Sequence, residues 1–388
     1  MYYARLWLAA LLFFTFAIIP SALRAQDIET KAKQAILLDY DTGAVLFAKA
    51  PDAHMPTSSM SKVMTMYLVF ESLKNGQLKL GDSLLVSEKA WRMGGSKMFV
   101  PVGKKVKIED LIRGVVVQSG NDATIVLAEG LAGSEAAFAQ ALNKKAKELG
   151  MNNSQFMNAS GWPDPDHYST AHDLALLAKR MITDFPEYYS YYAEKEFTFS
   201  KIKQGNRNPL LYRNIGADGI KTGHTKDGGY GLMASGKADG RRVILVVNGL
   251  SSLQERADEA AKLLQWGLSG FENSRPLKKG DVVEQASVAM GVSQTVGLEV
   301  SQDVTVTVPK LFRDELKVKM RYKSPLIAPL TKGAQVGSLI VKIPRSEDTI
   351  EVPLLVNRDV AELGFVAKTL AKAKYFVSAK QQKKGAEE

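Results

Sequence analysis

Three short motifs bring together side chains that could carry out acyl transfer. The segment MPTSSMSKVMT places Ser59 three residues before Lys62. If a helix begins near Ser59, this spacing puts the hydroxyl and the ammonium on one face, where they can touch. A serine in the first turn of a helix also lies beside unpaired backbone N–H groups, which stabilise negative charge on oxygen. The pattern is also consistent with a plain helix cap by Ser58 or Ser59, and Ser200 and Lys203 repeat it elsewhere.

The other two motifs supply further polar groups on a turn and on a strand. Ser119 and Asn121 follow the apolar run VVVQ, on a turn before a predicted helix. Lys221, Thr222 and Gly223 lie on a predicted strand in GADGIKTGHTKDGGYG. Each motif alone is common, but the order S-x-x-K, S-x-N, K-T-G, with spacings of about sixty and about a hundred residues, is specific. The set indicates a serine nucleophile that is activated by a lysine.

This chemistry requires Lys62 to accept a proton near neutral pH. A serine hydroxyl is a poor nucleophile, so a base must remove its proton during attack. The chain has no cysteine and presents no evident Ser-His-Asp arrangement, which leaves Lys62 as the candidate base. Its pKa must fall well below the free value of about 10.4. Burial beside a second cation has that effect, and Lys221 is the predicted second cation.

The motifs and their surroundings resemble the serine penicillin-binding proteins and β-lactamases, and more narrowly the low-molecular-mass D-alanyl-D-alanine carboxypeptidases of the bacterial periplasm. The resemblance covers essentially the whole chain, including AILLDYDTGAVLFAKAPDAHMPTSSMSKVMT, NRNPLL before GIKTGHT, and the β-rich C-terminal part. One departure is the pair Thr57 and Ser58, where family members usually have a single small residue after the proline. Ser58 is therefore an alternative nucleophile, although Ser61, and not a lysine, stands three residues after it.

The resemblance implies a catalytic role for three residues. Ser59 is the nucleophile, Lys62 is the base, and Ser119 relays the proton to the leaving amine. The backbone N–H groups of Ser59 and His224 form the oxyanion hole that acyl transfer needs. The remaining residues bind the substrate, including its terminal carboxylate, with the arginines as outer support: Asn121, Lys221, Thr222, Gly223, His224, Arg207 and Arg256. The implied chemistry calls for no metal and no organic cofactor.

The activity implied is removal of the terminal D-alanine from peptidoglycan stem pentapeptides through an acyl-enzyme, with β-lactams as covalent inhibitors. One alternative is the same chemistry used as a D,D-endopeptidase or a weak β-lactamase. The loop around His167 contains no E-x-x-L-N pattern, which argues against an efficient β-lactamase. The other alternative is a catalytically silent cell-wall binding protein, and the intact motifs argue against it.

Composition limits the other classes of function. The 388 residues are 45% hydrophobic and 24% charged, as in an ordinary globular protein long enough for two domains. The net charge of +10 is spread along the chain without a basic-aromatic motif, so an anionic cell-surface polymer or lipid is a better partner than nucleic acid. The four histidines show no metal-ligand spacing.

The chain changes character along its length. Strand-like and helical segments alternate in residues 26–271, which predicts a mixed α/β or α+β domain; the resemblance implies an α+β catalytic domain of the β-lactamase/transpeptidase type. Short β-type runs between turns fill residues 272–356 and predict a small β-sandwich or barrel, of which we expect the sandwich. Residues 357–388 form the third part, a terminal amphipathic helix with a basic tail.

The N-terminus indicates export. Arg5 precedes the apolar run from Leu6 to Ile19, Pro20 breaks it, and small residues precede a predicted cut after Ala25. We therefore expect residues 1–25 to be a signal peptide and the mature protein to be periplasmic. An uncleaved transmembrane anchor is the alternative, but it needs ~20 apolar residues.

The C-terminal segment has the pattern of a helix lying on a membrane surface. Lys368 and Lys372 lie opposite a stripe of apolar residues at three- and four-residue steps, and more lysines follow. Such a helix can attach the enzyme peripherally to the outer face of the inner membrane, apolar side down. The alternative is that it packs on the β-rich domain. The stripe consists of Val360, Leu363, Val366, Ala367, Leu370, Ala373 and Val377.

Overall fold

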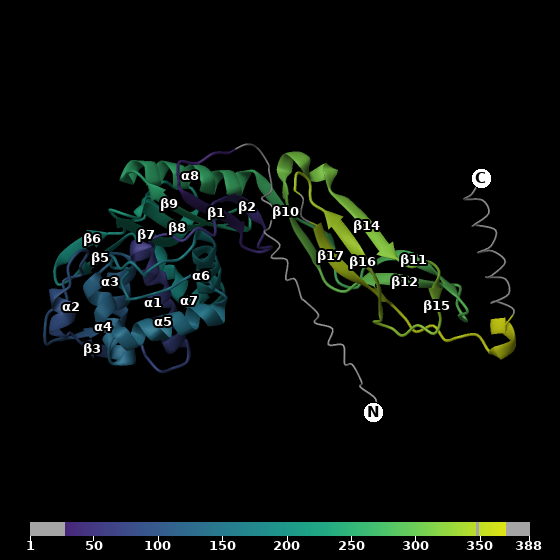
Figure 1. Ribbon diagram of the computed structural model, residues 1–388, viewed down its shortest axis with the longest axis horizontal. Coiled ribbons are helices and arrows are strands. Elements are labelled where there is room, and N and C mark those ends of the chain that lie inside the picture. Colours follow the sequence, from purple (N-terminus) through teal and green to yellow (C-terminus); the bar gives the residue numbers. More distant parts are fainter. Residues whose placement is uncertain (1–27, 347–348, 370–388) are drawn as a thin grey trace, which may run out of the picture.

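The computed structural model describes residues 28–346 and 349–369, which form two parts arranged side by side along the long axis (Figure 1). The predicted signal peptide and the second half of the predicted terminal helix lie outside the described residues. The first part is built on an antiparallel sheet of five strands in the order β2-β1-β9-β8-β7. Its strands are β1 (Gln34–Asp39), β2 (Val45–Lys49), β7 (Ala217–Thr225), β8 (Gly229–Ala238) and β9 (Arg241–Leu250).

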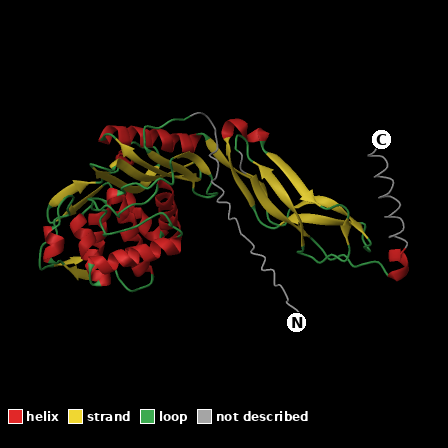
Figure 2. Ribbon diagram, viewed as in Figure 1, coloured by secondary structure: helices red, strands yellow, loops and turns green. Residues whose placement is uncertain are grey.

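Both faces of this sheet are covered by helices (Figure 2). In β9, Ile244 and Val246 pack on the larger helical layer, while Leu245 and Val247 pack towards α8 (Leu253–Ser269), as the two-residue period of a strand requires. This is why the run RVILVVNGL is apolar almost throughout. The larger layer contains α1 (Lys62–Lys74), α3 (Ile108–Val116), α4 (Asn121–Ala132), α5 (Glu135–Leu149) and α6 (Ala171–Asp184).

Smaller elements surround this layer. They are α2 (Glu88–Arg92), α7 (Pro186–Tyr189), the hairpin strands β3 (Ser83–Leu85) with β4 (Lys105–Lys107) and β5 (Glu196–Phe199) with β6 (Ile202–Gly205), and the 3₁₀ turns η1 (Ser58–Ser61), η2 (Ser190–Ala193) and η3 (Pro209–Tyr212).

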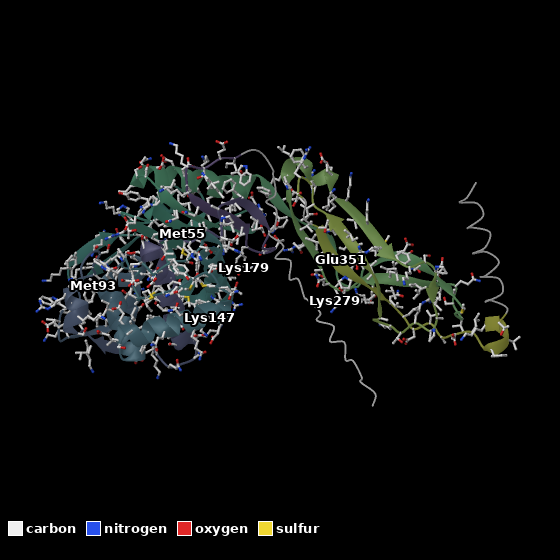
Figure 3. All side chains as sticks on the ribbon, in the orientation of Figure 1. Met55, Met93, Lys147, Lys179, Lys279 and Glu351 are labelled. Carbon is white, nitrogen blue, oxygen red and sulfur yellow. The ribbon has the colours of Figure 1, made fainter. Side chains whose placement is uncertain are left out.

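The second part is a β-sandwich, so the predicted α+β fold with a β-rich C-terminal domain is confirmed. A six-stranded sheet has the order β14-β16-β17-β12-β11-β15, and β10 pairs with β13 in a second, two-stranded sheet. The elements are β10 (Phe271–Leu277), β11 (Val282–Ala289), β12 (Thr295–Val300), β13 (Val304–Pro309), η4 (Lys310–Glu315), β14 (Lys317–Tyr322), β15 (Leu326–Ile327), β16 (Gln335–Lys342) and β17 (Thr349–Val356). Figure 3 shows Lys279 and Glu351 on this part and Met55 in the first part.

Polar contacts join the two parts beside β1. The carboxylate of Asp39 is fully buried and accepts a hydrogen bond from Arg241 at 2.8 Å and another from Asn273 of β10 at 3.2 Å. The hydroxyls of Thr42 and Thr307 lie 2.6 Å apart across the same junction. Because a buried carboxylate needs such partners, Asp39 ties β10 to the catalytic sheet.

The predicted terminal helix begins later than its apolar pattern indicated. Val360 is buried and pairs with Leu330 in a β-bridge, and the N–H of Leu363 donates to the carbonyl of Met290. Helical structure starts at Phe365, whose side chain is 88% exposed. The prediction that Val360 belongs to the membrane-facing stripe is therefore wrong, because its backbone and side chain are used by the β-sandwich.

In the described part of the chain, no single helix is long and apolar enough to cross a bilayer. The pair α4 and α5, bent by 82° between them, reaches that length and apolar composition only when taken together.

Candidate active site

The S-x-x-K motif lies at the start of α1, as the spacing predicts. Residues 58–61 form the 3₁₀ turn η1, and Lys62 is the first residue of α1. The tighter turn brings side chains three residues apart almost into line. Lys62 Nζ lies 2.8 Å from Ser59 Oγ, and Ser59 is half-buried at the edge of the cleft. The predicted contact between the hydroxyl and the amine is present.

Lys62 is held from three sides. Its side chain is 1% exposed, and its Nζ lies 2.7 Å from Asn121 Oδ1 and 2.7 Å from the carbonyl of Ser160. The Asn121 amide orientation is set by its Nδ2, which donates to the carbonyl of Gly94 at 2.9 Å. Both of these partners can only accept hydrogen bonds from the lysine. A neutral Lys62 therefore gives its two protons to them and keeps its lone pair for Ser59.

The environment also lowers the pKa of Lys62 to about 7, chiefly through burial and then through the charge of Arg207, while Asp122 opposes the shift. Burial likewise lowers the pKa of Lys221 well below its usual value, assisted by the charges of Lys62, Arg207 and Arg256. We expected Lys221 to be the cation that acts on Lys62. Arg207 has the larger effect there, although the repulsion between the two lysines must act on both.

Ser119 lies at the turn that leads into α4. It is 2% exposed and has a φ of +59°, a left-handed conformation that is uncommon for a residue other than glycine. Such conformations cost of order 1–3 kcal/mol and persist where the surroundings enforce them. The N–H of the next residue, Gly120, donates to the carbonyl of Gly114 at 2.8 Å and fixes the turn. The buried carboxylate of Asp122 accepts hydrogen bonds from the backbone N–H groups of residues 98–100 and pins that segment to α4. Ser119 lines the same cleft as Ser59.

The K-T-G motif lies on β7, the edge strand of the sheet, which packs against η1. A side chain at Gly223 would place its Cβ 2.8 Å from the carbonyl oxygen of Thr57 and 3.2 Å from Ser58 Cβ. Only glycine allows this approach of β7 to the nucleophile turn. The next residue, His224, stacks its ring on Tyr230 at 3.9 Å and lines the cleft with Gly223 and Ser59. His224 therefore shares the cleft with the Ser59 hydroxyl.

Positive side chains gather at one end of this cleft, whose volume is about 520 Å³. Arg207 and Arg256 line it, as does Thr222. Arg207 donates to Ser96 Oγ at 2.5 Å, whereas the buried Nε of Arg256 has no hydrogen-bond partner within residues 28–346 and 349–369. Lys221 is buried just behind, with its Nζ 3.2 Å from the carbonyl of Thr222. This end of the cleft is suited to a carboxylate.

Ser58, the alternative nucleophile, points elsewhere. Its Oγ donates to Thr225 Oγ1 at 3.1 Å, and no amine or imidazole of the described chain lies within hydrogen-bond distance of it. A second serine of the turn, Ser61, is paired with Thr57 at 2.5 Å and with His167 Nε2 at 2.8 Å. His167 Nδ1 accepts from the N–H of Met157, so the ring donates to Ser61 and orders the loop. Burial lowers the pKa of His167 to about 4, which keeps the ring neutral.

Three further groups belong to the site and could not be identified from the sequence. They are Ser160, whose carbonyl holds Lys62, the carboxylate of Asp122, and Ser96, which contacts Arg207. A backbone carbonyl carries no sequence signal, and the motif SGND gave no reason to separate Asp122 from Asn121. Within the residues that the structure describes, no group of three or more potential metal ligands is assembled.

Comparisons with known proteins agree with this geometry. The family model described as D-alanyl-D-alanine carboxypeptidase matches residues 21–252, and the model of the penicillin-binding protein 5 C-terminal domain matches residues 271–362. The chain is 39% identical to D-alanyl-D-alanine carboxypeptidase DacC of Escherichia coli, over 91% of each chain.

Solved structures agree as well. The D-alanyl-D-alanine carboxypeptidase DacD of Francisella tularensis has a TM-score of 0.80 at 34% identity, covering 88% of this chain and 96% of that one. A penicillin-binding protein of Listeria monocytogenes, solved in an ampicillin-bound form, has a TM-score of 0.58 at 30% identity, covering 62% of this chain and 99% of that one. This chain therefore belongs to the D-alanyl-D-alanine carboxypeptidase family.

Proposed function

We propose that this protein is a serine-type D-alanyl-D-alanine carboxypeptidase that removes the terminal D-alanine from peptidoglycan stem pentapeptides and is acylated by β-lactams. The observation that carries the proposal is the set of contacts around Lys62. Two acceptors hold its protons and Ser59 Oγ lies 2.8 Å away, so the neutral amine can act on that hydroxyl alone.

The reaction then follows from the positions of these groups. Lys62 Nζ takes the proton of Ser59 Oγ as the oxygen attacks the carbonyl carbon between the two D-alanines. The oxyanion is received by the backbone N–H groups of Ser59 and His224. The proton passes through Ser119 to the nitrogen of the leaving D-alanine, the C–N bond breaks, and an ester to Ser59 remains. Water hydrolyses the ester with Lys62 again accepting a proton, which restores the free hydroxyl.

The cationic end of the cleft supports a carboxypeptidase, because the substrate of such an enzyme has a free terminal carboxylate. A substrate that ends in D-alanine presents a carboxylate one residue beyond the bond to be cut. We assign that carboxylate to Thr222, which lines the cleft, and to Lys221, which is buried next to it in the chain, with Arg207 and Arg256 as outer support. The unpaired Nε of Arg256 favours an anionic ligand, since a buried donor without a partner costs about 1–3 kcal/mol. An endopeptidase substrate, whose leaving group is a longer peptide, would have to fit the same end.

The experiment is a comparison of two substrates. The purified enzyme is incubated with a stem pentapeptide ending in D-Ala-D-Ala and with a cross-linked stem dimer, and the release of D-alanine and of monomer is followed. The proposal predicts rapid release of D-alanine and slow cleavage of the dimer. Faster cleavage of the dimer would make the protein an endopeptidase, and release from neither would make it a binding protein.

We also propose the cellular arrangement. Residues 1–25 act as a signal peptide, residues 26–271 form the catalytic domain, and the β-rich domain, expected at 272–356, continues to Leu363 through the backbone pairing of this segment. The helix that begins at Phe365 attaches the periplasmic enzyme to the outer face of the inner membrane. Truncation before Phe365 should keep β-lactam labelling and release the protein from membranes. A truncated protein that stays on membranes would contradict the attachment.

A further inference from the structure

A second groove opens beside the catalytic cleft and takes part in no step above. It has a volume of about 740 Å³ and lies between residues 54–58, the loop 161–168 and the end of β7. Met55, seen in Figure 3, is one of its lining residues. A smaller cavity of about 280 Å³ connects it to the nucleophile, because that cavity is lined by Ser59 on one side and by Trp162 and Thr225, which also line the groove, on the other.

The direction of the substrate follows from the positions of the cations. Arg207 and Arg256 line the catalytic cleft but neither the connecting cavity nor the groove, whereas the exposed Lys226 lines the connecting cavity. The leaving D-alanine, with its carboxylate, therefore extends from Ser59 towards the arginines. The acyl half of the peptide lies on the other side of the scissile bond, and the open space on that side is the connecting cavity followed by the groove.

The walls of the groove have a defined chemistry. Trp162 is 45% exposed and the rings of His54 and Tyr168 stack at 4.2 Å, so the groove offers apolar surface to a peptide. Two exposed carboxylates, those of Asp164 and Asp227, line the same space. Asp164 is oriented by the N–H of Asp166, which donates to its Oδ1 at 2.9 Å. Among the residues that the structure describes, no lysine or arginine lines the groove.

We propose that this groove binds the acyl half of the stem peptide and that Asp164 and Asp227 receive the side-chain ammonium of its diamino residue. The inference rests on the proposed carboxypeptidase function and specifies its substrate. In a stem whose side-chain amine has been acylated by cross-linking, that nitrogen is an uncharged amide. The enzyme therefore prefers pentapeptide stems whose diamino residue is free.

The test uses two peptides that differ only at that nitrogen. Release of D-alanine is measured from Nα-acetyl-L-Lys-D-Ala-D-Ala and from its Nε-acetylated counterpart, with the full-length enzyme at low salt. The wild type should show a roughly two- to thirtyfold higher kcat/KM for the free amine, the range for two solvent-exposed ion pairs. The double variant Asp164→Asn, Asp227→Asn should lose this preference, with its kcat/KM for the free amine falling to that for the acetylated peptide. Asparagine at position 164 retains the acceptor for the Asp166 N–H.

Asp166→Asn is the matched control, because Asp166 is an exposed carboxylate of the same loop that does not line the groove. It should keep the wild-type preference. Equal rates of the wild type on the two peptides, or a double variant that keeps the preference, would overturn this inference alone. Failure of both peptides to release D-alanine would overturn the proposed function together with the inference.

Discussion

Replacing Asp122 by asparagine should destabilise the protein far more than a typical loss of one surface charge. The side chain is fully buried. Its Oδ1 accepts from the N–H groups of Met98 at 3.0 Å and Ala123 at 2.9 Å, and its Oδ2 accepts from those of Phe99 at 2.9 Å and Val100 at 3.2 Å. An asparagine amide has one oxygen, so its NH₂ group must face two N–H donors. Two buried donors without an acceptor cost about 1–3 kcal/mol each, or roughly 2–6 kcal/mol of unfolding free energy.

The same change should alter the pH dependence of acylation. The charge of Asp122 raises the pKa of Lys62, which is about 7 in the wild type, so its removal lowers that pKa further. Acylation needs the neutral amine, and the rate rises with pH through this pKa. The rising limb of the Asp122→Asn profile should therefore lie at lower pH than that of the wild type.

Urea unfolding followed by tryptophan fluorescence measures the first effect, and labelling by a fluorescent penicillin between pH 5 and 9 measures the second. Asp166→Asn, which removes an exposed carboxylate, is the control and should change neither. A loss of less than about 1 kcal/mol for Asp122→Asn would refute the hydrogen-bond argument. If the rising limb of the pH profile stays in place or moves to higher pH, the effect of the Asp122 charge on the pKa of Lys62 is refuted.

Three further predictions follow from the same contacts. Wild-type labelling should rise with pH through about 7 and level off above it, and a flat profile between pH 5 and 9 would exclude Lys62 as the base. Lys62→Arg keeps the charge but cannot deprotonate, so labelling should fall ~10²–10⁴-fold, the range for a lost general base. Lys221→Arg should lose less labelling, because a cation remains at that position. Equal losses of labelling in the two variants would contradict separate roles for the two lysines. Gly161→Ala would place Cβ 1.8 Å from the carbonyl oxygen of Ser58 and should abolish labelling. Gly133 has the same φ of +75° but open space around it, so Gly133→Ala should lower only the stability measured in a thermal melt. Similar labelling of the two variants would contradict the close packing of the loop on η1.

The sequence was sufficient for the part of the site that depends on local geometry. Ser59 and Lys62 meet because three-residue spacing in a helical turn places side chains together, and no tertiary information is needed for that. The position of Lys221, Thr222 and Gly223 on a strand followed from the glycines and apolar runs around them.

The partners of Lys62 could not be predicted in the same way. The carbonyl of Ser160 reaches it from a loop 98 residues away, and the charge of Arg207 acts across the cleft from another segment. Both depend on how the layers pack, so the sequence predicts Lys221 as the principal neighbouring cation, whereas the structure has Arg207 in that role. The groove that contains Trp162 was missed for the same reason, since its walls come from three separate segments.

The C-terminal segment shows the limit of periodicity. Val360, Leu363 and Val366 have helical spacing, yet Val360 pairs with Leu330 in a bridge and contributes to the core of the β-sandwich. Backbone hydrogen bonds to a neighbouring segment, which no pattern within the segment reveals, outweighed its local preference. The helical pattern holds only from Phe365 onward within the described residues.

The most direct test of the account identifies the serine that is acylated. The protein is trapped with a penicillin, digested and mapped by mass spectrometry, alongside Ser59→Ala and Ser58→Ala variants. The contacts of Ser59 with Lys62, and of Ser58 with Thr225 alone, predict the adduct on Ser59, its absence in Ser59→Ala and its persistence in Ser58→Ala. An adduct on Ser58, or labelling of Ser59→Ala at the wild-type rate, would contradict the assignment of the nucleophile.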